Sequence, residues 1–174
     1  MNKISAIILL LFFCFKGNCQ TVTITDIMDH MSCKDFSCIN DFITAKGFSY
    51  TKSADKDTHI TYIYSSDDAV QATSSKELLF KNEFHYTVGN DGKILLKFVT
   101  VSKPQYQELM KEVTALKFTV VTSSDLPGGM RVMIYGSPAY KNMSLYIILF
   151  SKKTEYGGSA SGYGFQLQEK GNAD

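Results

Sequence analysis

Arginine is almost absent from this chain, and no cluster of lysines takes its place. Arg131 is the only arginine, and the chain as a whole is nearly neutral, with 18 basic and 17 acidic residues. Binding a nucleic acid requires clustered basic side chains that neutralise several phosphates. We therefore expect no nucleic-acid partner.

The sequence also lacks the common catalytic and cofactor-binding motifs. It contains no Gly-x-Ser-x-Gly elbow, no His-Glu-x-x-His helix, no Gly-Lys-Ser/Thr phosphate loop and no EF-hand loop. Its three histidines, His30, His59 and His85, are far apart along the chain. We expect no metal, no cofactor and no catalytic residues.

Residues 1–19 have the pattern of a secretory signal peptide. Lys3 precedes a mostly apolar run over 4–15, which is well short of the ~20 residues that cross a bilayer as a helix. Cleavage after Cys19 would make Gln20 the first residue, and such a start resembles exported proteins of the Bacteroidota. We expect export to the periplasm or the extracellular space, with no integral membrane segment after cleavage. Lipidation of Cys19 or Cys14 and an uncleaved anchor helix are the alternatives.

The stretch HMSCKDFSC, residues 30–38, holds the two cysteines that remain after cleavage. In an oxidising compartment, two cysteines that can reach each other are usually paired. Redox catalysis favours Cys-x-x-Cys, whereas the spacing from Cys33 to Cys38 is longer. A zinc site that recruits His30 and Asp29 or Asp35 is another alternative, although structural zinc takes four ligands, and two free thiols are the last. We predict a structural disulfide between Cys33 and Cys38 that braces a turn between two helices.

Helical and strand periodicities follow each other along the rest of the chain. Apolar residues at helical spacing predict helices over 24–31, 36–46 and 103–117. Alternating β-branched and aromatic residues predict seven strands, over 48–53, 58–66, 76–88, 93–102, 118–124, 129–137 and 143–153. The stretch EYGGSASGYG, residues 155–164, is rich in glycine and serine, which favours a flexible surface loop.

A shift of 70 residues aligns parts of the chain with each other. It matches Ile39 with Leu109, Ile43 with Val113, Phe48 with Phe118 and Leu79 with Leu149. We predict an α+β fold built as a tandem repeat of a helix and an antiparallel β-meander. The first unit would cover 20–101 and the second 102–174, in one compact domain with the helices on one face of the sheet or sheets. This layout resembles that of the β-lactamase inhibitory proteins, whose joined sheets present a concave face to an enzyme.

The alternation also assigns strand residues to the two faces of the sheet. In the first unit, Glu83 and His85 are expected on a polar face that points away from the helices. The 70-residue shift assigns an apolar group in the second unit to the same side: Arg131, Met133, Tyr135, Leu145, Ile147 and Leu149. This group is either a partner-binding surface or is buried between the units.

These observations predict an exported protein that works by binding a protein or cell-envelope partner through a sheet face or loops. An inhibitor or immunity protein that blocks another protein's active site is an alternative within that class. A small cell-wall or glycan hydrolase is the alternative of another class. It would require His59, His85 and Glu83 to converge in a cleft, because an enzyme needs titratable groups gathered in a pocket.

Overall fold

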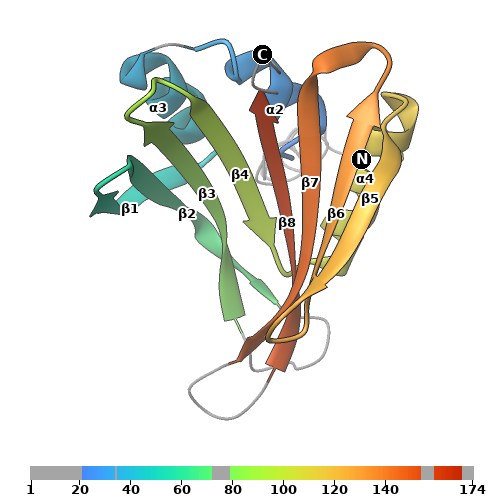
Figure 1. Ribbon diagram of the computed structural model, residues 1–174. Helices are drawn as coiled ribbons and strands as arrows, with labels where there is room; N and C mark the ends of the chain where they lie inside the picture. Colours follow the sequence, from blue (N-terminus) through green and yellow to red (C-terminus); the bar gives the residue numbers. More distant parts are fainter. Residues whose placement is uncertain (1–20, 34, 72–78, 154–158, 170–174) are drawn as a thin grey trace, which may run out of the picture.

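In the part of the chain that the structure describes, three helices and one large antiparallel sheet are formed (Figure 1). The structure is a computed structural model that describes residues 21–33, 35–71, 79–153 and 159–169. The predicted α+β class is therefore confirmed. The predicted signal peptide, residues 1–19, lies outside the described residues.

The helices begin where the sequence places a capping side chain. They are α2 (Ile24–His30), α3 (Phe36–Ala45) and α4 (Lys103–Ala115). The carboxylate of Asp35 accepts a hydrogen bond from the backbone N–H of Cys38 at 2.8 Å and caps α3. The hydroxyl of Ser102 caps α4 in the same way, from Gln105 at 3.3 Å. In the described segments, no helix is long and apolar enough to cross a membrane.

Eight strands form the sheet, in the order β1-β2-β3-β4-β8-β7-β6-β5. All neighbouring strands are antiparallel, and the first four strands meet the last four where β4 pairs with β8. The strands are β1 (Phe48–Lys56), β2 (His59–Gln71), β3 (Leu79–Gly89), β4 (Ile94–Thr100), β5 (Thr119–Leu126), β6 (Met130–Ser137), β7 (Tyr140–Lys153) and β8 (Ser159–Glu169).

The central strand β8 is the main departure from the sequence prediction. Residues 155–164 were expected to form a loop, but from Ser159 onward the described chain is strand. The glycines have a packing role here, because a Cβ on Gly162 would lie 2.3 Å from the ring of Phe150, and one on Gly164 would lie 3.2 Å from Cε of Lys97. Neighbouring side chains therefore lie across these two glycines, which is one of the uses of glycine inside a strand.

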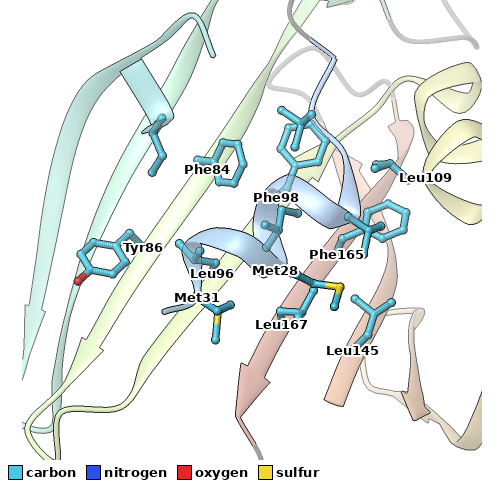
Figure 2. Packing of buried hydrophobic residues seen from close by; sticks show 14 of the residues in the cluster. Met28, Met31, Phe84, Tyr86, Leu96, Phe98, Leu109, Leu145, Phe165 and Leu167 are labelled. Atoms are coloured by element: carbon cyan, nitrogen blue, oxygen red, sulfur yellow. The ribbon is translucent and has the colours of Figure 1, made fainter. Parts of the chain in front are cut away.

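One face of the sheet, which we call the core face, is lined by large apolar side chains in register. Tyr64, Phe84, Phe98 and Phe165 are direct neighbours across β2, β3, β4 and β8, and each is fully buried. Side chains from all three helices belong to the same buried cluster, among them Ile27, Ile39 and Leu109. Figure 2 shows members of this cluster from helix and sheet close together. In Figure 1 the three helices lie behind the sheet.

Several local features of the first half recur 70 residues later. The β1–β2 register shifts between Tyr50 and Lys52, and the β5–β6 register shifts between Val120 and Thr122. Each shift leaves one extra residue in the edge strand, as a β-bulge does. Three of the four pairs that the shift matched are buried at both positions: Ile39 and Leu109, Ile43 and Val113, Phe48 and Phe118.

Candidate functional site

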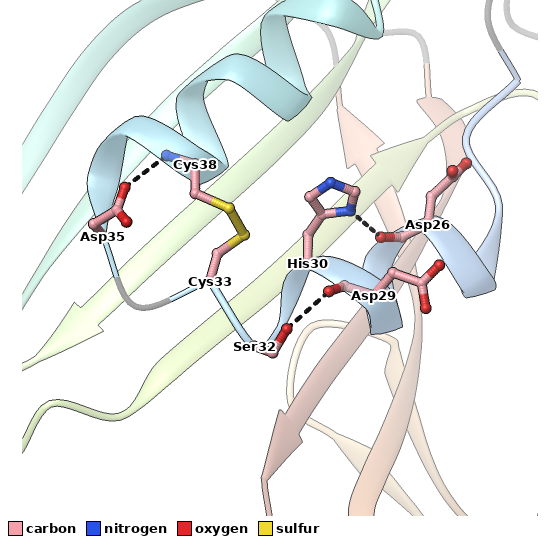
Figure 3. Close-up of a disulfide and its surroundings, with 7 residues drawn as sticks. All are labelled: Asp26, Asp29, His30, Ser32, Cys33, Asp35 and Cys38. Atoms are coloured by element: carbon pink, nitrogen blue, oxygen red, sulfur yellow. Dashed lines mark hydrogen bonds between the residues drawn. A yellow bond between two sulfur atoms is a disulfide. The ribbon is translucent and has the colours of Figure 1, made fainter.

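The turn between α2 and α3 is closed by a disulfide, so neither of its two cysteines is a free thiol. Cys33 and Cys38 form the predicted disulfide, with their Cα atoms 5.8 Å apart (Figure 3). His30 Nδ1 donates a hydrogen bond to the backbone carbonyl of Asp26 at 2.8 Å, and its ring stacks on Phe42. Among the described residues, no three His, Cys, Asp or Glu side chains come together as metal ligands.

The sequence predicted six residues as a possible partner surface. Five of them are apolar and lie on the core face, and the sixth, Arg131, is exposed at the end of the same group. Tyr135, Leu145 and Ile147 are buried in the core cluster, and Met133 and Leu149 pack against it. Their strand neighbours include Phe165 and Leu167, which are fully buried on the same face. Arg131 is exposed and its Nε donates to Asp125 Oδ1 at 2.7 Å. The 70-residue shift assigned these residues to the face of Glu83 and His85, and that assignment is wrong, because the apolar members are buried on the core face with the helices.

The opposite face of the sheet, which we call the open face, carries a row of side chains that crosses all eight strands. The row was not recognised from the sequence, because its second half depends on β8 and on the true register. From β1 to β5 in sheet order it consists of Lys52, Ile63, His85, Lys97, Gln166, Tyr146, Ile134 and Thr122.

A hollow of about 510 Å³ lies in the open face, over β2, β3, β4 and β8. Pockets that bind small molecules or inserted side chains typically have volumes of this order. The lining is mixed, with leucine and isoleucine beside polar groups. Its polar side chains include His59, Thr61, His85, Lys97, Gln166 and Gln168.

Lys97 lies at the centre of the row and lines the hollow. Burial lowers the pKa of its ammonium group, and the negative charge of Glu83 offsets part of that effect. Among the described residues, the Lys97 ammonium makes no ion pair and no hydrogen bond. Its stem lies over Gly164, where a Cβ would lie 3.2 Å from Cε.

Hydrogen-bonded side chains continue the polar lining toward β7. The amide of Gln166 donates to the amide oxygen of Gln168 at 3.5 Å, and Gln168 donates to the hydroxyl of Tyr146 at 3.0 Å. On the other side of Lys97, the hydroxyls of Thr61 and Thr87 lie 2.9 Å apart. The hollow therefore presents several donors and acceptors around a half-buried ammonium.

Glu83 and His85 form a pair beside the hollow, as their alternate positions on β3 allow. Nε2 of His85 lies 2.9 Å from Oε2 of Glu83. His59 lines the same hollow, but it pairs with Gly89 while His85 pairs with Ile63. The two histidines are thus four residues apart along β2, or about 13 Å at the rise of a strand. His59 instead lies 2.9 Å from the hydroxyl of Thr58.

The other half of the open face is apolar. Half-buried side chains of β6 and β7 continue the same face beyond Gln166, namely Val132, Ile134, Tyr146, Ile148 and Phe150. Phe150 lies over Gly162, its neighbour in β8. The open face therefore combines a polar hollow that holds a cation with an adjoining apolar patch, defined by these five residues.

A signal for Lys97 was present in the sequence. It is the only charged residue within ILLKFVT, the segment that forms β4. Its alternate neighbours Leu95 and Val99 are apolar, so the position is expected to be partly buried. A lone lysine at such a position costs desolvation energy, and this cost was the clue that sequence analysis missed.

A search of protein-family models, curated proteins and solved structures finds no match to this chain.

Proposed function

We propose that this chain is an exported binding protein that recognises a partner protein through the open face of its sheet. The observation that carries the proposal is the hollow of about 510 Å³ beside the apolar patch, on the face opposite the core. A surface that combines a concave polar region with contiguous apolar side chains is typical of protein-binding sites. The Cys33–Cys38 disulfide supports export, since disulfides persist in oxidising compartments.

An inhibitor or immunity protein is one specific form of this function. Such a protein would cover the active site of its target with the open face. The size of the sheet favours this form, because the row of side chains crosses all eight strands and offers a broad contact surface.

A hydrolase is the second candidate, and the Glu83–His85 pair is the observation in its favour. A carboxylate that contacts a histidine at a hollow is an arrangement that general bases use. Two facts favour the binding protein instead. His59 lies about 13 Å along the strand from His85, so the three residues do not converge. Lys97, the neighbour of His85 on β4, also lines the hollow, so the histidine has a cation beside it.

We also propose that the two halves of the chain, 20–101 and 102–174, are tandem copies of one unit. The recurrence of the edge-strand bulge and of three buried pairs at a spacing of 70 residues supports this. A second support is the end of the helices, where Gly47 and Lys117 both have a left-handed backbone, with φ of 78° and 58°. The disulfide and α2 would then be additions to the first copy.

The binding proposal is tested by affinity capture from the native envelope fraction with three forms of the protein. The wild type and Gln107→Arg, a change on the exposed surface of α4, are expected to retain the same protein partner. Tyr146→Arg places a charge in the apolar patch and is expected to lose that partner while its circular dichroism remains unchanged. Retention of the same partner by Tyr146→Arg would overturn the proposal. Product release from envelope glycans that His85→Ala abolishes would establish the hydrolase instead.

A further inference from the structure

The Lys97 ammonium is a half-buried cation without a direct partner among the described residues. Charged groups inside a protein are usually paired, because an unpaired charge there is costly. A second lysine at the hollow, Lys93, does have a partner. Lys93 also lines the hollow, but its Nζ is 2.7 Å from Oδ2 of Asp91. Glu83, the carboxylate whose charge acts on Lys97, is engaged with His85 at 2.9 Å.

The surroundings of Lys97 suit a carboxylate. The stem of Lys97 extends over Gly164 of β8, and Lys97 pairs with Gln166 of the same strand, whereas Gln168 pairs with Leu95, farther along the hollow. The amide of Gln166 has two N–H donors, and its hydrogen bond to Gln168 uses one of them. An incoming carboxylate would therefore meet the ammonium through one oxygen and the remaining N–H of Gln166 through the other. Hydrogen bonds between charged groups of this kind are stronger than neutral ones.

The adjoining apolar patch indicates that the carboxylate belongs to a protein. A free organic acid would fill the hollow and leave Ile134, Ile148 and Phe150 uncovered. A protein surface that presents an acidic side chain beside apolar ones would cover both regions together. Interfaces of this composition, with a desolvated charge next to apolar area, are common between proteins.

We infer that Lys97 is the docking point for an aspartate or glutamate side chain of the partner protein, which enters the hollow over β8. This inference rests on the proposed binding function. It assigns Lys97 the role of counter-ion to the partner and Gly164 the role of making room for the lysine stem.

The site is tested with the purified protein by NMR of its labelled lysine side chains. The probe is glutamate blocked at both ends, and the control probe is the equally blocked glutamine. Blocked glutamate is expected to shift the Lys97 signals, whereas blocked glutamine leaves them unchanged. Lys97→Met removes one set of signals and thereby assigns them to Lys97, and Lys93→Met should retain the response of Lys97. Gly164→Ala keeps the charge but displaces the stem, so it is expected to weaken the response.

Two outcomes of this titration overturn the inference: blocked glutamate fails to shift the Lys97 signals, or blocked glutamine shifts them equally. A stronger response to galacturonic acid than to blocked glutamate would also overturn it, in favour of an acidic glycan.

Binding of the captured partner by two variants distinguishes a failure of this inference from a failure of the binding proposal. If both hold, Tyr146→Arg loses the partner and Lys97→Met weakens its binding about tenfold or more, with a loss of salt dependence. Loss in Tyr146→Arg with unchanged binding in Lys97→Met overturns the inference alone. Unchanged binding in both variants overturns both.

Discussion

At the residue scale, the residues with a left-handed backbone after α3 and α4 differ in the steric cost of that conformation. Gly47 has a φ of 78° and Lys117 a φ of 58°, and only glycine adopts this region without steric cost. We expect Lys117→Gly to stabilise the protein by about 0.5–1 kcal/mol and Gly47→Ala to destabilise it by about 1 kcal/mol. No atom lies within 4 Å of the added Cβ at Gly47, so the cost is confined to the backbone. Urea unfolding measures both changes, and equal stability of Lys117→Gly and wild type would contradict the assignment.

Asp26 of α2 forms an ion pair with Lys46, the residue that follows α3. Its carboxylate accepts from Lys46 Nζ at 2.8 Å and from the backbone N–H of Thr23 at 2.9 Å. Burial alone would raise the pKa of Asp26, but these hydrogen bonds outweigh it and hold the pKa below the usual 3.8. A carboxylate with a lowered folded-state pKa stabilises the fold above the unfolded pKa, and this contribution is lost as the pH falls through the folded pKa.

Asp26→Asn should therefore destabilise the protein by about 1–2 kcal/mol at neutral pH. The difference from wild type should shrink below about pH 4, where the wild-type carboxyl takes up a proton. Urea titrations at several pH values measure this trend. Asp91→Asn is the control, since its ion pair with Lys93 is exposed and is expected to matter little. A pH-independent effect of Asp26→Asn would show that charge has no part in it.

At the element scale, glycines in β8 let side chains of the neighbouring strands lie directly against its backbone. A Cβ on Gly162 would lie 2.3 Å from the Phe150 ring. We expect Gly162→Ala to destabilise the protein by about 1–3 kcal/mol, because the ring must move out of a packed position. In a Phe150→Ala background the same change should cost much less, and unfolding of the four proteins gives the coupling. An equal cost in both backgrounds would contradict this contact.

The strand β8 is also the element that the sequence pattern did not predict. The three helices and seven strands follow from periodicity and capping residues such as Asp35 and Ser102. β8 was missed because glycine carries no periodic signal, and here its role is to make room for Phe150 and Lys97. The candidate site was missed for the same reason, since the row through Lys97 continues into Gln166 of β8. The predicted face of Tyr135, Leu145 and Ile147 is wrong, because they are buried on the core face. A uniform shift of 70 residues does not follow the strand register, and an error of one residue moves every side chain to the other face.

At the scale of the whole molecule, the two halves share one core. Leu167 of β8 pairs with Leu96 of β4 on one side and with Leu145 of β7 on the other, and all three are fully buried. Leu167→Ala should cost about 2–5 kcal/mol. It should lower one cooperative transition, which circular dichroism and tyrosine fluorescence report alike. Two separated transitions, of which only one responds to Leu167→Ala, would show that the halves unfold independently.

If the open face is the surface that meets the partner, site-specific photo-crosslinking in the native envelope should detect the contact there. A photoreactive phenylalanine derivative would replace Gln166 in the hollow or, as the control, Gln107 on the exposed surface of α4. We expect a covalent adduct with one protein from position 166 and none from position 107. An adduct from position 107, with none from position 166, would contradict it.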